Sequence, residues 1–262
     1  MRLACRPHRP SAPATPRRPR SGRRDGRGQT DPRDDVSRFL KTHRDEATAA
    51  EALRRASILR RAGLPTPHAM AGADARQVSF ARIEGETGLP LLASGLAGLL
   101  ELVALLHECP VAGLPPLDPF RRIRPREALL RNEEIRSVLD ETVPSGTATL
   151  HGDLHAGQFI RDGGGTVWIV DLDDLTLGPP EADLANFAAH SATSLQGGVE
   201  LWADRVRAAW RDIGRPCDDD VFRRLLRIAL VRRHLKLRET GRPDHEAMVA
   251  TYLRESSNFS IL

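Results

Sequence analysis

The side chains best suited to chemistry lie in one stretch near the middle of the chain. A short apolar run leads into His151 and Asp153, which a single glycine separates. Two β-rich runs, residues 158–161 and 166–170, then flank an Asp-Gly-Gly-Gly turn and lead into Asp171. This pattern predicts a β-hairpin, because glycine adopts the positive φ angles of tight turns. When the hairpin closes, the two aspartates come close together, and two carboxylates beside a histidine and an amide favour binding a divalent cation and orienting a hydroxyl or water.

An ordered set of motifs continues from this stretch. Read along the chain, it consists of His151, Gly152, Asp153, Gln158, Asp171, Gly178-Pro-Pro180 and Asp183-Leu-Ala185. The set resembles the aminoglycoside phosphotransferase and choline kinase branch of the protein-kinase-like fold. In that family His-Gly-Asp is followed by four residues and an amide, then by a hairpin, an aspartate, Gly-Asp-Pro and Asp-Leu-Ala. Pro179 stands in place of the acid of Gly-Asp-Pro, and a looser resemblance runs from about Phe39 to the C-terminal helices.

The resemblance implies an α+β, two-lobed protein-kinase-like fold with a reduced N-lobe and a mainly helical C-lobe. We expect a disordered Arg/Pro-rich tail over residues 1–35, the N-lobe and hinge over 36–85, and the helical C-lobe over 86–262. The implied activity is transfer of the γ-phosphate of ATP, with Mg²⁺, to a hydroxyl of a small molecule. GTP in place of ATP stays open, because the hinge contacts of the family are made by backbone groups.

The resemblance also assigns roles within the catalytic loop. Asp153 would accept a hydrogen bond from the acceptor hydroxyl and orient it toward the γ-phosphorus. Because an aspartate with a pKa near 4 is a weak base at neutral pH, orientation matters more than deprotonation. His151 would fix the loop rather than contact the substrate. Asp183 would support the loop by accepting hydrogen bonds from it.

The metal-binding residues are implied in the same way. Asp171 would bind Mg²⁺, which prefers hard oxygen ligands and keeps several waters. Gln158 stands where the family more often has asparagine, and its carbonyl reaches one methylene farther. Asp173 would add a contact to the metal, or it forms with Asp174 a pair of exposed turn acids.

The N-terminal part of the folded region looks like the small lobe of a kinase. We predict a strand over residues 36–43, a helix over 45–63 and a second strand over 77–83. Lys41 ends the first strand, where the family uses a lysine against nucleotide phosphates. The usual partner of that lysine is a helix glutamate, and Glu51 is the nearest candidate. A glycine-containing hairpin over the phosphates is missing from this part of the pattern.

Charge and cysteine content limit the class of protein. Residues 1–35 contain ten arginines and four aspartates, so this tail has a net charge of +6. Because the whole chain has a net charge of +4, the remaining residues are net negative. The tail has no aromatic residues that would stack on bases, which makes nucleic acid an unlikely partner. Three scattered cysteines favour a reducing compartment, and no apolar stretch follows the N-terminal arginines. We therefore expect a cytoplasmic protein.

The rest of the chain reads as helices that build the C-lobe. Residues 89–106 are the longest apolar run, but Pro90 and Glu101 interrupt it, so a buried helix is favoured over a membrane span. A second helix is predicted over residues 126–142. Four more are predicted over residues 183–190, 199–213, 218–237 and 245–254. In the resembling family this region helps to form the acceptor site, and the pattern does not identify the acceptor among aminoglycosides, sugars and amino alcohols.

Two other functions compete with the kinase interpretation. His151, Asp153, His155 and Asp171 could form the metal set of a calcineurin-like metallophosphoesterase. The later Gly-Asp-x-x-Asp-Arg and Gly-Asn-His motifs of that family do not occur downstream. The second alternative is a non-catalytic kinase-like binding protein, which the missing glycine hairpin favours and the intact aspartate pair opposes.

Overall fold

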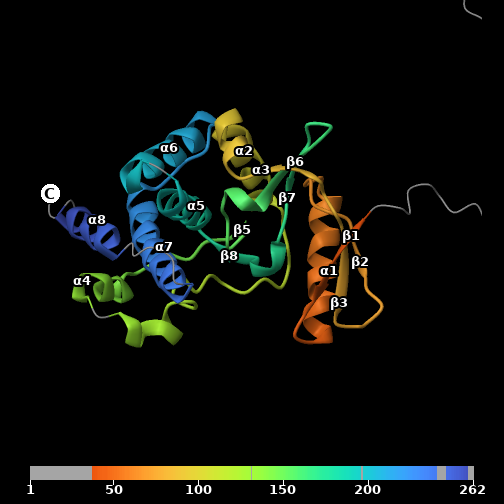
Figure 1. The fold of residues 1–262 in the computed structure, drawn as a ribbon, viewed down its shortest axis with the longest axis horizontal. Helices are drawn as coiled ribbons and strands as arrows, with labels where there is room; N and C mark the ends of the chain where they lie inside the picture. Colours follow the sequence, from red (N-terminus) through yellow and green to blue (C-terminus); the bar gives the residue numbers. More distant parts are fainter. Residues whose placement is uncertain (1–36, 131, 196, 241–245, 259–262) are drawn as a thin grey trace, which may run out of the picture. The chain divides into compact units, whose positions relative to one another are not determined.

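The computed structural model of the protein describes residues 37–130, 132–195, 197–240 and 246–258. The predicted tail, residues 1–35, lies outside the described residues. The described elements form a small N-terminal lobe of strands and one long helix, followed by a larger lobe that is mainly helical (Figure 1). The strand-helix-strand order predicted for the small lobe is confirmed.

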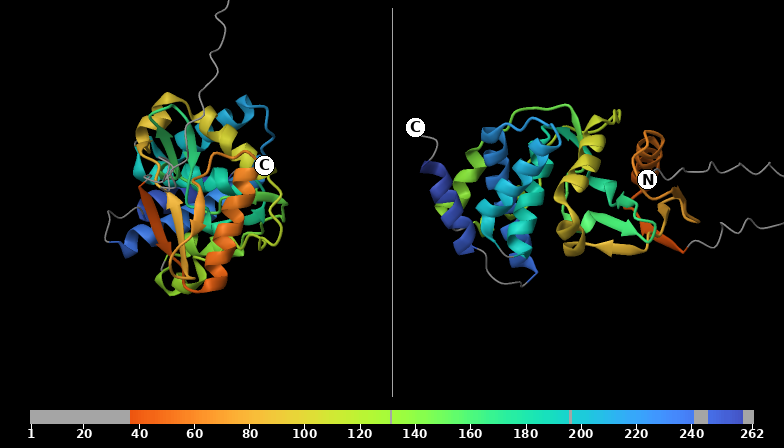
Figure 2. Two further views of the ribbon diagram at one scale, coloured as in Figure 1. Left: turned by 90° about the vertical axis from the view of Figure 1, so that its right-hand side faces the viewer. Right: turned by 90° about the horizontal axis from the view of Figure 1, so that it is seen from above.

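The small lobe is built around a three-stranded antiparallel sheet in the order β1-β3-β2. The strands are β1 (Arg38–Thr42), β2 (Ala69–Ala71) and β3 (Gln77–Ala81), and α1 (Glu46–Arg61) packs beside them (Figure 2). Asp45 caps α1, since its Oδ1 accepts a hydrogen bond of 2.7 Å from the main-chain N–H of Thr48. In the register of the sheet, Lys41 lies opposite Val78 near the end of β1.

Two further small sheets hold the stretch that carries the motifs. The strands β4 (Gly85–Thr87), β6 (Phe159–Asp162) and β7 (Val167–Ile169) pair in that order and are antiparallel. Asp162 Oδ1 accepts hydrogen bonds of 2.9 Å from the main-chain N–H groups of Gly164 and Thr166, which closes the turn between β6 and β7. The predicted hairpin is thereby confirmed.

The third sheet pairs β5 (Ala148–Leu150) with β8 (Thr176–Gly178), and Leu150 lies opposite Thr176. These strands lie just before His151 and just after Asp174, so their pairing closes the intervening chain into one loop system. The two aspartate-bearing ends are thus held at one place by main-chain hydrogen bonds.

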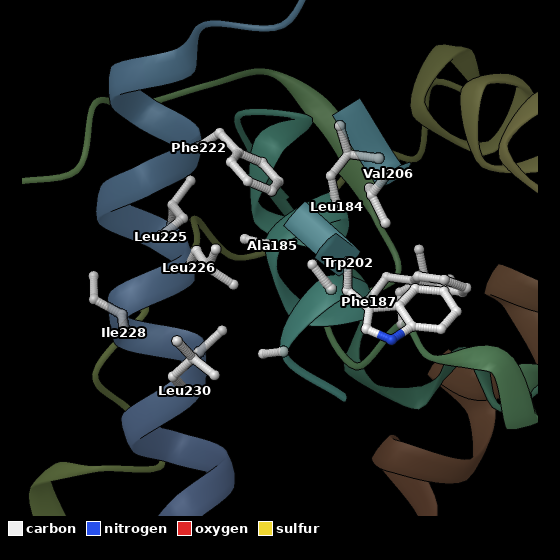
Figure 3. Packing of buried hydrophobic residues seen from close by; sticks show 14 of the residues in the cluster. Leu184, Ala185, Phe187, Trp202, Val206, Phe222, Leu225, Leu226, Ile228 and Leu230 are labelled. Atoms are coloured by element: carbon white, nitrogen blue, oxygen red, sulfur yellow. The ribbon is translucent and has the colours of Figure 1, made fainter. Parts of the chain in front are cut away.

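Helices form the body of the larger lobe. They are α2 (Leu89–Ser94), α3 (Leu96–Glu108), α4 (Glu133–Arg136), α5 (Glu181–Ser194), α6 (Gly198–Asp212), α7 (Asp219–Glu239) and α8 (Glu246–Asn258). The helix α5 is buried against both α6 and α7, and Phe187, Trp202 and Phe222 fill the space among the three (Figure 3). The four predicted C-terminal helices are confirmed. No helix in the described part of the chain combines the length and the apolar composition needed to cross a membrane.

Two predicted helices differ from those in the structure. The apolar run near residue 90 forms two helices, α2 and α3, because Gly95 between them takes a φ of 140°, outside the helical region. The helix predicted over residues 126–142 is replaced by short pieces. These are the 3₁₀ helix η1 (Arg124–Leu129), α4 and the 3₁₀ helix η2 (Ser137–Asp140). Asn132 caps α4 and so begins a new helix inside the predicted one, since its side chain accepts from two main-chain N–H groups.

Candidate active site

The loop that follows β5 and carries His151 and Asp153, here called the catalytic loop, meets the end of the hairpin at Gly152 and Asp174. Gly152 has a φ of 78°, and a Cβ atom there would lie 2.1 Å from the main-chain oxygen of Asp174. Any side chain at this position would therefore collide with the other segment. The sequence anticipates this approach in general terms, because it places both segments at the ends of paired strands.

Lys41 links the small lobe to the end of the hairpin. Its Nζ lies 2.7 Å from Asp171 Oδ1 and 2.5 Å from Asp173 Oδ2. Partial burial alone would lower the pKa of Lys41, but the two carboxylates outweigh this and raise the pKa above its ordinary value. The two carboxylates therefore converge on one positive charge.

Asp171 sits in a strained backbone conformation. Its φ of 59° and ψ of 58° make it the one non-glycine residue with positive φ in the described chain. Burial alone would raise the pKa of Asp171, but the hydrogen bond from Lys41 and a weaker one of 3.3 Å from Gln158 Nε2 hold it below its ordinary value. The strained backbone thus presents an ionised carboxylate to Lys41.

Glu51 does not pair with Lys41, which corrects the expected lysine–glutamate ion pair. Its carboxylate binds Arg54 Nε at 2.6 Å and Arg55 Nε at 2.7 Å, both on the same helix. The hydrogen bonds from Arg54 lower the pKa of Glu51 to about 2 despite the opposing effect of burial. Because the two arginines lie one turn away along α1, they reach Glu51 locally, while Asp171 and Asp173 take the lysine.

A large cavity opens beside Lys41 and Asp171. Its volume is about 650 Å³, which is within the range of small-molecule sites. Lys41, Asp171 and Asp173 contribute the charged groups nearest the hairpin. The rest of the lining is largely apolar and includes Phe39, Ala52, Ala56, Pro67, Phe80, Ala81, Ile83, Ile160, Val170 and Leu172. The cavity therefore has charged groups at the hairpin and a largely apolar wall beside them.

Asp153 lies between two arginines. Arg232 Nη2 contacts Asp153 Oδ1, and Arg122 Nη1 lies 3.1 Å from Asp153 Oδ2. Burial alone would raise the pKa of Asp153, but the charges of Arg232 and Arg122 prevail and the pKa lies below its ordinary value. The predicted catalytic carboxylate is therefore ionised and positioned from both sides.

The helix α5 and the buried histidine hold this loop in place. Asp183 is 1% exposed and accepts hydrogen bonds of 2.8 Å from the main-chain N–H of His151 and 3.0 Å from that of Gly152. A third hydrogen bond comes from His107, whose Nε2 must carry the hydrogen because a carboxylate only accepts. His151 is fully buried, and its Nε2 donates to the main-chain oxygen of Val170 at 2.9 Å. These contacts tie the loop to both α5 and the hairpin.

A second cavity, of about 450 Å³, borders Asp153 on the side of the helical lobe. His155 lines it and stacks on His190, with ring centroids 4.4 Å apart. Gln158 Nε2 lies 3.2 Å from His155 Nε2 and 3.3 Å from Asp171 Oδ2. Gln158 therefore links Asp171, which lines the larger cavity, to His155, which lines the smaller one.

Sequence reasoning missed the arginines around Asp153 and the histidine partner of His155. Arg122 lies outside the sequence motifs, 31 positions before Asp153. Arg232 lies on α7, 79 positions after Asp153. No local signal joins these residues to Asp153, because only the packing of α7 and of the loop before η1 brings them to it.

The metal set of the metallophosphoesterase alternative is not assembled. His151 Nε2 is bound to a main-chain oxygen, and Asp153 is bound to arginines. Across the described ranges, no group of three or more histidine, cysteine, aspartate or glutamate side chains is arranged to hold a metal ion. The site consists instead of a lysine with two carboxylates, and a third carboxylate between arginines.

This fold is that of a kinase-like phosphotransferase. Residues 23–220 match the model of the phosphotransferase enzyme family, and the chain belongs to that family. No protein of curated function matches the chain in sequence.

Solved structures show the same fold. The choline kinase LicA from Streptococcus pneumoniae is 13% identical, with a TM-score of 0.59, and the match covers 86% of each chain. The aminoglycoside phosphotransferase APH(3'')-Id from Streptomyces rimosus, in complex with ADP and streptomycin, is 23% identical with a TM-score of 0.53 over 76% of this chain and 88% of that one. A choline/ethanolamine kinase family protein from Mesorhizobium loti is 16% identical, with a TM-score of 0.55, and the match covers 86% of this chain and 82% of that one. The predicted protein-kinase-like fold, with a reduced N-lobe and a mainly helical C-lobe, is confirmed.

Proposed function

We propose that the protein transfers the γ-phosphate of ATP to a hydroxyl of a small molecule, with Mg²⁺ as the required ion. The observation that carries this proposal is the short chain of side-chain contacts that links the linings of the two cavities. Lys41 and Asp171 lie at the end of the larger cavity, Asp153 borders the smaller one, and Gln158 with His155 lies between them. A donor phosphate in one cavity would thus face an acceptor hydroxyl in the other.

The larger cavity suits the nucleotide. Its apolar lining would take the base, and Lys41 would move from the carboxylates to the phosphates as these enter. LicA is known in complex with AMP and APH(3'')-Id in complex with ADP, which supports a nucleotide at this place in the fold. GTP remains the alternative donor. A reaction that consumes either nucleotide needs a compartment that supplies it, in keeping with the predicted cytoplasmic location.

The residues at the hairpin end fit a magnesium ion. Asp171 and Asp173 already converge on one cation, the ammonium of Lys41, and Mg²⁺ is commonly bound by one or two carboxylates together with substrate phosphates. Gln158 would join them once its amide rotates to present Oε1. Bound there, Mg²⁺ supplies positive charge that neutralises the phosphate oxygens.

Asp153 would orient the acceptor for in-line attack. Its carboxylate accepts the hydrogen bond of the hydroxyl, whose oxygen forms the new bond to the γ-phosphorus while the bond to the departing ADP oxygen breaks. The lowered pKa of Asp153 makes it a weak base, so the proton leaves late in the transfer. Arg122 and Arg232 hold the carboxylate in position during this step.

The test is the melting temperature of the protein with and without millimolar Mg-ATP, compared with Mg-GTP and with ATP in excess EDTA. A ligand at about 100 times its Kd stabilises a protein by about 2.7 kcal/mol, which is a shift of several degrees. We expect a Mg-dependent shift in the wild type that is lost in Asp171→Ala.

The matched control is Asp140→Ala, which removes a carboxylate that lies in η2 and lines neither cavity. It is expected to retain the full shift. A folded wild-type protein whose melting temperature does not respond to either nucleotide would contradict the proposal and favour the non-catalytic alternative.

A further inference from the structure

The smaller cavity is lined mainly by cations. Five of its nine lining residues are positively charged, and they are Arg122, Arg126, Arg232, Arg233 and Lys236. Asp153 contributes the one carboxylate among the residues that line it. An acceptor that enters this cavity to reach Asp153 therefore meets an excess of positive charge.

Neighbouring acids among the described residues engage part of this charge. Asp174 contacts Arg122, and Glu239 contacts Arg126, so two carboxylates outside the lining engage two of the five cations. With Asp153 these make three carboxylates against five cations. Arg233 donates to the neutral hydroxyl groups of Thr193 at 3.1 Å and Ser194 at 3.2 Å. Among these described groups, five cations face three carboxylates.

Three of the cations are concentrated on α7. Lys236 follows Arg232 by four positions and Arg233 by three, so it neighbours both on the helix surface, and like charges at such spacings destabilise a helix. Their location in the last two turns of α7 offsets part of this cost through the helix dipole. The dipole does not explain why Arg232 is only 20% exposed, since a charge serving the helix end alone would lie in solvent.

The histidines of the cavity do not add charge at neutral pH. Burial, with a further contribution from Arg233, lowers the pKa of His190 to about 3. Burial likewise lowers the pKa of His155, although Asp153 opposes this. The stacked rings therefore offer neutral hydrogen-bonding edges and a flat wall, while the arginines and Lys236 supply the charge.

We propose that the acceptor is an anion: a small hydroxyl compound that also carries a phosphate or carboxylate group, which Arg233, Lys236 and Arg126 bind while its hydroxyl lies at Asp153. This inference rests on the proposed phosphotransferase function and names the class of its acceptor. Arginine and lysine suit both anions, since arginine binds carboxylate and phosphate with paired N–H groups and lysine as a point charge. Amine-bearing acceptors are disfavoured, because their ammonium groups would lie among five like charges.

The experiment measures binding by calorimetry with the larger cavity filled by Mg²⁺ and a non-hydrolysable ATP analogue. The probes are inorganic phosphate, acetate and glucosamine, which represent the phosphate, the carboxylate and the amine classes. We expect inorganic phosphate or acetate to bind more tightly than glucosamine. The one that binds more tightly indicates which anionic group the acceptor carries.

Variants that reverse a charge on α7 test where the anion binds. Lys236 is exposed, so Lys236→Glu preserves the fold, and we expect it to weaken anion binding about tenfold, the effect of losing one charged hydrogen bond. Arg233→Gln is expected to weaken binding in the same direction. The matched control Arg224→Glu makes the same charge change on the same helix, about 18 Å along its axis. Because this exceeds the screening length, its effect stays within about twofold at physiological salt.

Tighter binding of glucosamine than of both anions would overturn the inference, and so would anion binding that Lys236→Glu leaves unchanged. Mg-nucleotide binding is measured separately in the same samples, which distinguishes the two proposals. If nucleotide binding is intact but the anions do not bind more tightly than glucosamine, only the proposal of an anionic acceptor is contradicted. Absence of nucleotide binding, with phosphate binding that still depends on Lys236, removes the phosphotransferase proposal and leaves an anion site.

Discussion

At the scale of single residues, Asp153 is the position on which the chemistry depends. It is ionised and held between Arg122 and Arg232, and its pKa lies below the ordinary aspartate value. A carboxylate accepts hydrogen bonds at both oxygens through about four lone pairs, so two arginine contacts leave room for an acceptor hydroxyl. In the proposed reaction its function is therefore to orient the hydroxyl rather than to remove its proton in advance.

Replacing this carboxylate tests that role. Asp153→Asn keeps the size of the side chain but removes the charge that accepts the hydroxyl proton, and we expect kcat to fall about 10²- to 10⁴-fold. The affinity for Mg-nucleotide should stay within a few fold, because Asp153 does not line the larger cavity. The measurements are ADP release with the acceptor and nucleotide binding by calorimetry.

The control for this variant is Asp118→Asn, which also removes a carboxylate paired with an arginine, Arg124, at an exposed position. It should turn over like the wild type. Normal kcat in Asp153→Asn, in protein with an unchanged melting temperature, would remove Asp153 from the proposed mechanism.

At the scale of elements, α5 acts as the support of the catalytic loop. Asp183 accepts three hydrogen bonds from the loop and from α3, and Asn186 one turn later donates to the main-chain oxygen of Leu154 at 2.7 Å. Burial alone would raise the pKa of Asp183, but the hydrogen bonds from His107 and from the main-chain N–H of His151 prevail and lower it. A buried, ionised carboxylate thus fixes the loop that carries Asp153.

This support predicts a pH-dependent loss of stability. Asp183→Asn replaces an acceptor by a side chain with a donating amide, and we expect the free energy of unfolding at pH 7 to fall by about 1.5–3 kcal/mol. Since the folded pKa of Asp183 is depressed, its contribution is present above the ordinary aspartate pKa and is lost as pH falls through the folded value. The gap between wild type and variant should therefore narrow below about pH 4.

Urea unfolding at several pH values measures this gap. Asp220→Asn, at an exposed carboxylate in the first turn of α7, is the matched control and should change the free energy of unfolding far less. A gap between wild type and Asp183→Asn that stays constant from pH 7 to pH 3 would show that the carboxylate charge of Asp183 does not stabilise the loop.

At the scale of the whole molecule, the small lobe and the helical lobe share one core. Leu59 and Leu64, at the end of α1 and just after it, belong to the same buried cluster as Phe159 and the helices of the larger lobe. The main-chain N–H of Ile169 donates to the oxygen of Pro65 at 2.9 Å, which joins the hairpin to the small lobe. Because the cluster is continuous, we expect the two lobes to unfold together.

The substitution Leu59→Ala tests this coupling. Leu59 is fully buried, so its truncation should lower the free energy of unfolding by about 2–5 kcal/mol. Calorimetry should show one transition at a lower temperature, in which far-UV circular dichroism, dominated by the helices, changes together with the heat capacity. Leu105→Ala, at a leucine that is 48% exposed, serves as the control with a small effect. Two separate transitions in the variant would contradict a shared core.

Much of this molecule follows from local patterns in the sequence. The hairpin, the strand that carries Lys41 and the four C-terminal helices were predictable, because hydrophobic periodicity and turn residues act over a few neighbouring positions. The helix predicted over residues 126–142 was wrong, since the apolar spacing there suggests one helix, whereas Asn132 is better suited to cap a new helix than to lie inside one. The tertiary surroundings decide between these two uses.

The sequence by itself singled out the residues to which we assign the chemistry: Asp153 and Asp171 belong to an ordered motif, and Lys41 lies near the end of a strand. The tertiary structure alone decided what surrounds them. It paired Lys41 with Asp171 and Asp173 instead of Glu51, and it set Arg122 and Arg232 on either side of Asp153. The physical reason is that opposite charges pair when packing brings them within a few ångströms of each other. Packing brings together segments that no local sequence pattern connects.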